Sequence, residues 1–314
     1  MQHQESNSAL IVGSLAFDDL EMPTGTFENV LGGAATYSSL SASLLAPVRI
    51  VGVVGNDFEE SHLAMMKSRG IDTRGVERVT SGKTFRWRGR YAADLMSRTT
   101  LDTQLNVFAD FRPKIPVEYK KSAFVLLGNI HPALQIEVLD QIEKPRLTLA
   151  DTMNFWISGE PKLLAEMMRR IDLLIINEEE ARDLSGIHNL SRAAADILRR
   201  GPSRLIIKRG EYGAVLFDSA GMFFVPGYPL EEVLDPTGAG DTFAGGLLGY
   251  LARHGDPSPN AVRRGMFYAS ALASFCVEEI GTRRLMAVST ADLKKRIEQF
   301  VRLVDFGGNL VLAD

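Results

Sequence analysis

Asp235-Pro-Thr-Gly-Ala-Gly-Asp241-Thr-Phe-Ala-Gly-Gly246 is the stretch of this sequence that decides its fold. Glycine lets the chain turn through conformations that a Cβ would forbid, and the apolar, small-residue run over residues 243–251 predicts a packed helix after the turn. N–H groups at a helix start attract anions, phosphate above all, because the helix dipole is positive there. A carboxylate such as Asp241 beside these amides suits a base next to a transferring phosphoryl group. The alternative is a tight loop in which Asp241 only caps the helix.

Length and composition bound the class of protein. The 314 residues are enough for one large α/β domain or two small ones, and 45% hydrophobic with 24% charged residues is ordinary for a globular chain. A net charge of −4 with no strongly basic run gives no reason to expect nucleic acid as a partner. The single cysteine, Cys276, excludes an intrachain disulfide framework and fits a reducing compartment. No apolar run approaches the ~20 residues of a membrane span, so we expect a cytoplasmic protein without membrane contacts.

Outside the glycine-rich stretch, strand and helix patterns alternate along the chain. Short apolar runs predict buried strands, whereas longer small or amphipathic runs at residues 34–45 and 58–69 predict helices. The predicted strands are residues 9–13, 48–54, 123–127, 146–150, 173–176 and 204–207. Such alternation predicts an α/β fold with a mainly parallel central sheet and helices on both faces. Ligands would then bind beyond the carboxyl ends of the strands.

Residues 84–111 break this alternation. Residues 84–91 alternate with period two, so that aromatic and arginine side chains fall on opposite faces (Phe85, Trp87 and Tyr91; Arg86, Arg88 and Arg90). Residues 101–108 again mix apolar and polar side chains as a strand does. The segment predicts an antiparallel excursion with one covered and one exposed face. The arginines lie either on a solvated exterior or in a cleft, where they would contact an acidic or phosphorylated substrate.

The glycine-rich stretch resembles the second signature of the ribokinase (PfkB) family of sugar and nucleoside kinases, Asp-x-Thr-Gly-Ala-Gly-Asp, and matches it at every position. The resemblance implies a single ribokinase-like kinase domain over residues 1–314. It also implies a small β-sheet lid, inserted as segments at about residues 16–32 and 84–111. In the family this lid closes over the substrate and often forms dimer contacts, so we expect a homodimer through the lid.

The resemblance assigns roles to the signature itself. Asp241 matches the catalytic base that takes the proton from the substrate hydroxyl, and Gly238, Ala239 and Gly240 match the anion hole. Asp235 and Thr237 match positions that often bind an activating K⁺ ion together with a later loop, here near residues 277–282. Turn chemistry alone also explains an Asp-Pro-Thr sequence.

Two further motifs point to the nucleotide. Asn177 and Glu180 match the family's Asn-x-x-Glu motif, which organises Mg²⁺ and its waters around the phosphates of ATP; a helix N-cap followed by acidic residues is the alternative. Lys208, Gly210 and Gly213 resemble the glycine-containing turn that contacts the nucleotide, and a plain hairpin turn is the competing interpretation.

The substrate side carries weaker matches. Gly32 and Gly33 match the di-glycine hinge where the lid meets the helix that begins near residue 34. Asp18 matches the carboxylate that grips two substrate hydroxyls, although the adjacent Asp19 leaves the register open. Many relatives have Asn where this chain has Tyr37, which could hydrogen-bond a hydroxyl, stack on a ring or simply pack.

One more stretch resembles part of some sugar kinases of the family. Asp151, with Asn154 and Trp156, is similar to their Asp-x-x-Asn…Trp pattern, and we take it as pocket lining.

These matches predict an ATP-dependent phosphotransferase that acts on the exocyclic hydroxymethyl group of a sugar, with a nucleoside kinase as the alternative of the same family. A non-catalytic sugar sensor on this fold is the alternative from another class, since a fold alone does not fix function. The intact motif from Asp235 to Asp241, together with Asn177 and Glu180, favours the enzyme. Nothing in the sequence identifies the sugar or nucleoside.

Overall fold

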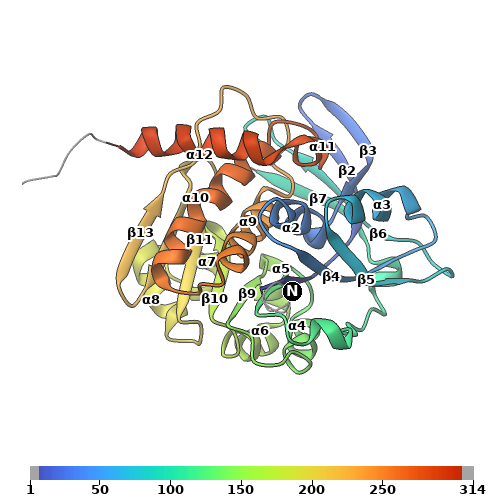
Figure 1. The fold of residues 1–314 in the computed structure, drawn as a ribbon, viewed down its shortest axis with the longest axis horizontal. Coiled ribbons are helices and arrows are strands. Elements are labelled where there is room, and N and C mark those ends of the chain that lie inside the picture. Colours follow the sequence, from blue (N-terminus) through green and yellow to red (C-terminus); the bar gives the residue numbers. More distant parts are fainter. Residues whose placement is uncertain (1–6, 96, 306–314) are drawn as a thin grey trace, which may run out of the picture.

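The computed structural model describes residues 7–95 and 97–305 (Figure 1). Within these residues the main sheet has nine strands in the order β13-β12-β11-β10-β9-β8-β1-β4-β5. Neighbouring strands are parallel from β11 to β5, whereas β12 and β13 are antiparallel additions at one edge. The strands are β1 (Ala9–Val12), β4 (Val48–Val54), β5 (Ile71–Arg78), β8 (Phe124–Leu127), β9 (Leu147–Asp151), β10 (Leu173–Asn177), β11 (Arg204–Lys208), β12 (Ala214–Asp218) and β13 (Gly221–Val225).

Helices cover both faces of this sheet, as the alternating pattern predicts. One face packs under helices that include α2, α3, α9, α10 and α12, and the other under α4, α6, α7 and α8, each with its own buried apolar cluster. The helices are α2 (Ala34–Ser43), α3 (Glu60–Ser68), α4 (Pro132–Leu139), α5 (Asn154–Gly159), α6 (Pro161–Met168), α7 (Glu178–Ser185), α8 (Leu190–Leu198), α9 (Ala239–His254), α10 (Pro259–Cys276), α11 (Arg283–Ala287) and α12 (Thr290–Val304).

The strand order reverses at β1. From β1 the chain pairs first toward β4 and β5 and later, from β8 onward, toward the opposite edge. In parallel α/β sheets, ligands bind at the carboxyl ends of the strands near such a reversal. Predicted site residues that lie far apart in the sequence therefore come together at the end of the sheet where the parallel strands finish.

A separate sheet has the order β3-β2-β6-β7 and forms the lid (Figure 1). Its strands are β2 (Ala16–Met22), β3 (Gly25–Gly32), β6 (Phe85–Tyr91) and β7 (Arg98–Gln104). Both predicted lid segments therefore belong to one sheet. The period-two alternation of β6 is also confirmed, because Trp87 and Tyr91 pack in a small apolar cluster while Arg88 and Arg90 are exposed.

Several predicted boundaries differ from the structure by one or two residues, and at two places aromatic packing accompanies a difference. Strand-like structure does not continue over residues 101–108, because β7 ends at Gln104 and Asn106–Phe108 form a 3₁₀ turn. There Phe108 stacks on Phe85 and Phe111 with ring centroids 5.6 and 5.4 Å apart, so aromatic packing decides the local conformation. The helix predicted over residues 58–69 begins at Glu60, and Phe58 instead packs as a buried side chain before it.

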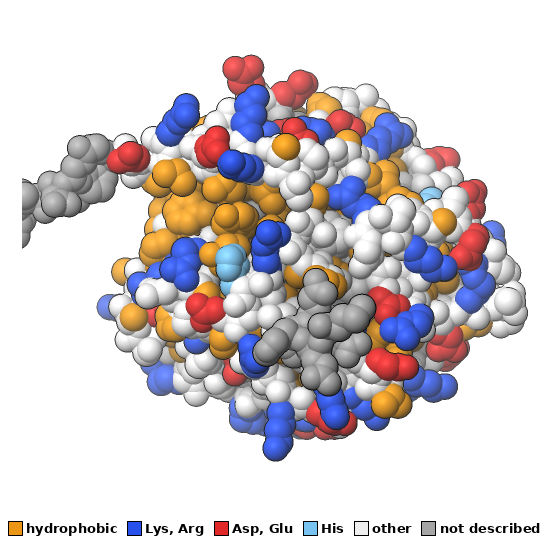
Figure 2. Space-filling view, viewed as in Figure 1, with side chains coloured by type: hydrophobic (Ala, Val, Ile, Leu, Met, Phe, Trp, Pro, Cys, Tyr) orange, Lys and Arg blue, Asp and Glu red, His pale blue; other side chains and the backbone are white. Residues whose placement is uncertain are grey.

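The surface shows no strong segregation of charge in the view of Figure 2, where acidic and basic side chains alternate around the rim. Hydrophobic side chains gather near α12 and the sheet edge, where Met222, Phe224, Val301, Leu303 and Val304 are exposed. Among the described residues, no helix combines the length and apolar character that crossing a membrane requires.

Candidate active site

The phosphate turn, residues 235–241, leads directly into α9. Gly238 is the N-cap of this helix and adopts φ +74°, a left-handed conformation that favours glycine, and no side chain caps the helix end. Asp241 lies in the first helical turn, so the alternative in which it serves as the helix cap is wrong. A 16-residue helix whose N-terminus lacks a side-chain cap leaves backbone N–H groups available to an anion.

A cluster of charged side chains surrounds this turn. Although Asp241 is partly exposed, desolvation by the surrounding protein and then the charge of Asp151 raise its pKa to about 7, against the opposing effects of Lys208 and Arg98. A carboxyl group with such a pKa changes protonation near neutral pH, which is the range a general base needs.

Lys208 at the end of β11 is a mostly buried cation of this cluster, with its side chain 17% exposed. Its Nζ lies 3.0 Å from Oδ2 of Asp151 at the end of β9. Burial lowers the pKa of Lys208, but Asp151, Glu180 and Asp241 raise it and prevail, so the ammonium group stays charged. A Cβ added at Gly240 would lie 2.9 Å from that Nζ, which shows how closely the lysine approaches the phosphate turn. Asp151, predicted to line the substrate pocket, thus contacts Lys208; a role toward substrate stays a prediction.

The other two residues of the predicted pocket-lining stretch are engaged elsewhere. Asn154 donates from Nδ2 to Asp183, 2.7 Å away, and Trp156 donates from Nε1 to Asn129, 3.0 Å away. Neither bond involves the phosphate turn.

Asn177 and Glu180 form a reciprocal capping box at the start of α7. The Asn177 side chain accepts from the Glu180 N–H at 2.8 Å, and the Glu180 carboxylate accepts from the Asn177 N–H at 2.7 Å. The helix-cap alternative is therefore present in the structure. Glu180 is nevertheless buried beside the cluster, and burial followed by the charge of Asp151 raises its pKa to about 7.

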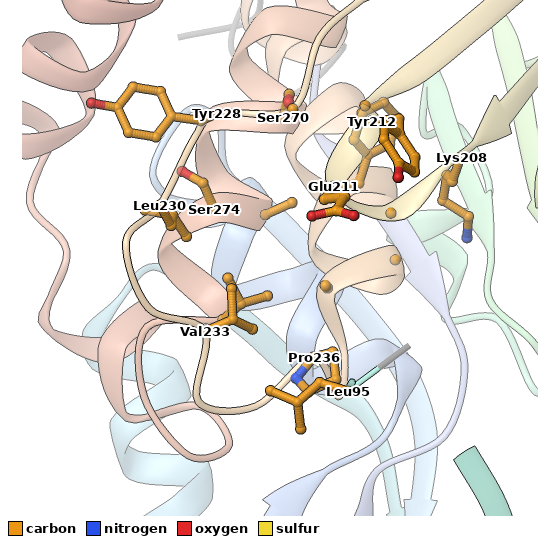
Figure 3. A pocket seen from close by; sticks show the side chains of 18 of the residues that line it. Leu95, Lys208, Glu211, Tyr212, Tyr228, Leu230, Val233, Pro236, Ser270 and Ser274 are labelled. Carbon is orange, nitrogen blue, oxygen red and sulfur yellow. The ribbon is translucent and has the colours of Figure 1, made fainter. Parts of the chain in front are cut away.

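A cavity of about 590 Å³ opens on the other side of the turn (Figure 3). Gly210 and Gly213 line it at φ +57° and +89°, and a Cβ at Gly213 would lie 2.1 Å from the Val225 carbonyl oxygen. Lys208 and Tyr212 enter it from the same hairpin, and Gly240 forms part of its wall. Of the residues predicted to contact the nucleotide, Lys208, Gly210, Gly213 and Gly240 therefore line one cavity, whereas Asn177, Glu180 and Gly238 are not part of its lining.

Asp18 on β2 faces away from the lid exterior and into the protein. It is 5% exposed, and a Cβ at Gly32 would lie 2.0 Å from its Oδ2, so only glycine fits at that position. Burial raises the pKa of Asp18 to about 8, and the neighbouring carboxylates of Asp235 and Asp241 add to the rise. Asp19 points the other way and pairs with Arg86 at 3.0 Å. The open choice of register is thereby decided in favour of Asp18 as the inward carboxylate.

Gly33 links the lid to α2. It adopts φ +95°, and a Cβ there would lie 2.5 Å from the Ser14 carbonyl oxygen, so glycine is required at this junction.

Tyr37 on α2 lies against the phosphate turn, and the charge of Asp18 also acts on it. Its ring lies against Gly238, where an added Cβ would approach the ring to 2.4 Å, and its hydroxyl is buried without a hydrogen-bond partner. Burial, followed by the charge of Asp18, raises its pKa well above the usual range. The structure shows the packing role of Tyr37, whereas a hydrogen bond to a substrate hydroxyl and stacking on a substrate ring stay predictions.

The loop near residues 277–282, predicted to lie beside Asp235, does contact this residue. The two oxygens of the Asp235 carboxylate accept from the N–H groups of Thr237 and Gly281, each at 2.8 Å, and the Val277 carbonyl accepts from Leu234 at 2.8 Å. These bonds fix the Asp235 carboxylate and connect it to the later loop, and binding of K⁺ at Asp235 and Thr237 stays a prediction.

The three arginines of β6 are paired within the lid itself. Arg86 contacts Asp19, whereas Arg88 and Arg90 contact the two oxygens of Glu21 at 2.7 and 2.6 Å. The repulsion among these positive charges is therefore offset by carboxylates of β2 and not by groups in the cleft.

Sequence reasoning missed two lid residues that face the site. Arg98 starts β7 opposite Tyr91, and its charge partly opposes the rise in the pKa of Asp18, Asp241 and Glu180. Tyr91 itself hydrogen-bonds the Thr237 hydroxyl across 2.9 Å. The period-two pattern places Tyr91 on the covered face, but no local signal shows what covers it.

The donor set fits an ion that arrives with a phosphate ligand. Within residues 7–95 and 97–305, no group of three or more acidic, histidine or cysteine side chains could hold a metal ion by itself. Mg²⁺ keeps several waters and uses few protein ligands when it binds with phosphates. A role of Asn177 and Glu180 in holding Mg²⁺ through water stays a prediction, since their side chains form the capping box of α7 in the structure.

Comparisons with known proteins agree with this geometry. The model for the pfkB family of carbohydrate kinases matches residues 8–288. A cytidine kinase of Thermococcus kodakarensis is 30% identical over 262 residues, covering 82% of this chain and 92% of the relative. A ribokinase of Bacillus subtilis is 26% identical over 283 residues, covering 82% and 85%.

Solved structures share the fold. A nucleoside kinase of Methanocaldococcus jannaschii superposes with a TM-score of 0.77 at 19% identity, covering 93% of this chain and 98% of that structure. A nucleoside kinase of Burkholderia thailandensis, solved in complex with inosine, gives 0.77 at 21% identity, covering 93% and 97%.

Proposed function

The chain belongs to the pfkB family of carbohydrate kinases, and we propose that it transfers the γ-phosphoryl group of ATP to the exocyclic hydroxymethyl group of a nucleoside or sugar. The observation that carries the proposal is the phosphate turn with Asp241 in the first turn of α9, flanked by the Lys208 ammonium and the 590 Å³ cavity. The similarity to a cytidine kinase favours a nucleoside as acceptor.

In the proposed reaction Asp241 accepts the proton of the acceptor hydroxyl. The hydroxyl oxygen forms a bond to the γ-phosphorus, the bond to the β–γ bridging oxygen breaks, and ADP leaves with that electron pair. The N–H groups of residues 238–241 and the Lys208 ammonium stabilise the charge on the transferring phosphoryl group. Asp18 orients the acceptor hydroxyls. Mg²⁺, when bound with the phosphates, would neutralise part of their charge.

K⁺ at Asp235 and Thr237 and a homodimer through the lid remain proposals on which no step depends.

An acceptor panel tests the proposal. ADP formation from ATP is measured with cytidine, other nucleosides, ribose and hexoses, together with the 5′-deoxy form of any nucleoside that is used. We expect one class to stimulate ADP formation and its 5′-deoxy form to be inert. Acceptors that bind without stimulating turnover would instead support the non-catalytic sensor.

Asp18→Asn is expected to impair use of the acceptor more than binding of the nucleotide. An amide matches the shape of the carboxyl group but replaces one oxygen by an NH₂ group, so an acceptor hydroxyl loses its hydrogen-bond partner. This should lower kcat/KM for the acceptor about 10- to 100-fold, while the affinity for ATP, measured by calorimetry, stays within about threefold. The matched control is Asp19→Asn, which alters the adjacent carboxylate that pairs with Arg86. An ATP affinity that collapses while acceptor affinity holds would contradict the assignment.

The same variant is expected to change the pH dependence of stability. Because the pKa of Asp18 is raised to about 8 in the folded protein, its contribution favours folding at acidic pH and is lost as the pH rises from about 4 to 8. Thermal unfolding should show Asp18→Asn gaining stability relative to the wild type between pH 6 and pH 8.5. If the difference in thermal stability between the two proteins stayed constant over this range, the raised pKa of the buried Asp18 carboxyl group would be contradicted.

Arg98→Gln is expected to lower kcat/KM about five- to tenfold, as for a partly screened charge contact. The reason is that Arg98 is a lid cation whose charge acts on Asp18 and Asp241. The remaining activity should depend less on salt. Arg88→Gln is the matched control, since Arg88 pairs with Glu21 on the lid. If both substitutions changed kcat/KM equally at every salt concentration, a specific role of Arg98 at the site would be contradicted.

A further inference from the structure

The lid packs directly on the loops that flank the phosphate turn. Leu20, Met22 and Tyr91 of the lid form a buried apolar cluster with Ile280, and Leu234 packs against the same cluster. Leu234 immediately precedes the phosphate turn, and Ile280 precedes Gly281, whose N–H donates to Asp235. The lid therefore contacts both segments that determine where the turn lies.

One polar contact crosses this boundary. The Tyr91 hydroxyl lies 2.9 Å from the Thr237 hydroxyl, and the two side chains belong to residues that are only 6% and 7% exposed. Burial raises the pKa of Tyr91, so this hydroxyl keeps its proton and can donate. Thr237 is also bound through its N–H to Asp235 and through its carbonyl to the Cys276 thiol. Thr237 is thus held by the lid as well as by the main domain.

The position of Thr237 decides the position of the anion-binding N–H groups. The next residue, Gly238, turns the chain at φ +74° and begins α9. Catalytic hydrogen-bond donors act well only when they are fixed in place before the charge develops. A threonine released from Tyr91 would leave a buried hydroxyl without its partner and loosen the adjacent turn.

The lid also reaches the nucleotide cavity. Leu95, in the loop that follows Tyr91, lines this cavity together with Pro236 of the phosphate turn (Figure 3). Opening of the lid would therefore remove part of the cavity wall as well as the bond to Thr237.

We propose that Tyr91 is a positioning residue that couples closure of the lid to the geometry of the phosphate turn. With the lid closed, its hydroxyl holds Thr237 and thereby sets the donors of residues 238–241; with the lid open, this bond is lost. The inference rests on the proposed function, because it takes the turn to bind the transferring phosphoryl group. Acceptor binding under the lid then prepares the turn for phosphate.

Tyr91→Phe tests the bond while keeping the ring in the apolar cluster. We expect kcat to fall about 5- to 100-fold, as for a buried hydroxyl that loses its partner, with the KM for the acceptor changed less than about threefold. Tyr119→Phe is the matched control, because its hydroxyl donates to the Asp72 carbonyl, 3.3 Å away and outside the site. A wild-type kcat in Tyr91→Phe would overturn the proposal.

Hydrogen exchange separates this inference from the proposed reaction. In the unliganded protein, amides of residues 238–242 should exchange faster in Tyr91→Phe than in the wild type or in Tyr119→Phe. This readout needs no acceptor, so faster exchange in a protein without kinase activity would support the coupling and refute the proposed function. Unchanged exchange would refute the coupling even in an active kinase.

Thr237→Val removes the same bond from the other side. Combined with Tyr91→Phe, it should cause little further loss of protection at residues 238–242, because both substitutions break one interaction. Additive losses would show that Tyr91 acts on the turn by another route, and would overturn the proposal.

Discussion

Asp241→Asn should keep the fold and the nucleotide site but lower turnover about 10²- to 10⁴-fold, the usual contribution of a general base. The amide has nearly the same shape as the carboxyl group and cannot accept the proton of the acceptor hydroxyl. Steady-state kinetics with the best acceptor measures the loss, and calorimetry with ATP checks that the nucleotide still binds. Asp140→Asn is a matched control, since Asp140 pairs with Arg170 on the surface.

The pH profile adds a second criterion to this prediction. Because the pKa of Asp241 is raised to about 7, the wild-type kcat/KM should rise with pH through about 7 as the carboxyl group loses its proton. The residual activity of Asp241→Asn should lack this rise. Turnover close to wild type, or an unchanged rise near pH 7, would rule out Asp241 as the base.

Lys208→Met should destabilise the protein by about 3–5 kcal/mol, the usual effect of removing one member of a buried ion pair. The substitution leaves Asp151 buried with Glu180 and Asp241 nearby and without its cation 3.0 Å away. Turnover should also fall, because a cation beside the phosphate turn is lost. Denaturant unfolding measures the stability change, and kinetics below the unfolding transition measures the activity.

Two variants make this prediction specific. Lys67→Met is the matched control, because Lys67 and Glu60 form an exposed pair at 3.4 Å and such pairs contribute about 0–1 kcal/mol. Adding Asp151→Asn to Lys208→Met should recover much of the stability, since the carboxylate that pairs directly with Lys208 is then replaced by a neutral amide. A loss no larger than that of Lys67→Met would show that the buried pair is unimportant.

The sequence predicts the scaffold well because its signals are local. Apolar runs at residues 9–13 and 48–54 become β1 and β4, and the glycine-rich stretch becomes the turn and the beginning of α9. Phe108 shows the limit of local patterns: its contacts with Phe85 and Phe111 hold residues 106–108 in a 3₁₀ turn where the alternation predicts a strand.

The site is predictable only in part, because its remaining contacts join distant segments. Nothing near Tyr91 indicates that its hydroxyl meets Thr237, 146 residues away. The pairing of Lys208 with Asp151 likewise depends on the ends of two strands in the sheet and not on either motif. The choice between Asp18 and Asp19 needed the direction in which each side chain leaves β2.

Proton-coupled ³¹P NMR of the product formed from ATP and the best acceptor tests the proposed chemistry most directly. Transfer to an exocyclic hydroxymethyl oxygen predicts a phosphate ester signal split into a triplet by two methylene protons, formed by the wild type and lost in Asp241→Asn. A doublet, which a secondary or anomeric ester gives, would contradict transfer to the hydroxymethyl group. Release of inorganic phosphate alone would contradict phosphoryl transfer to the acceptor.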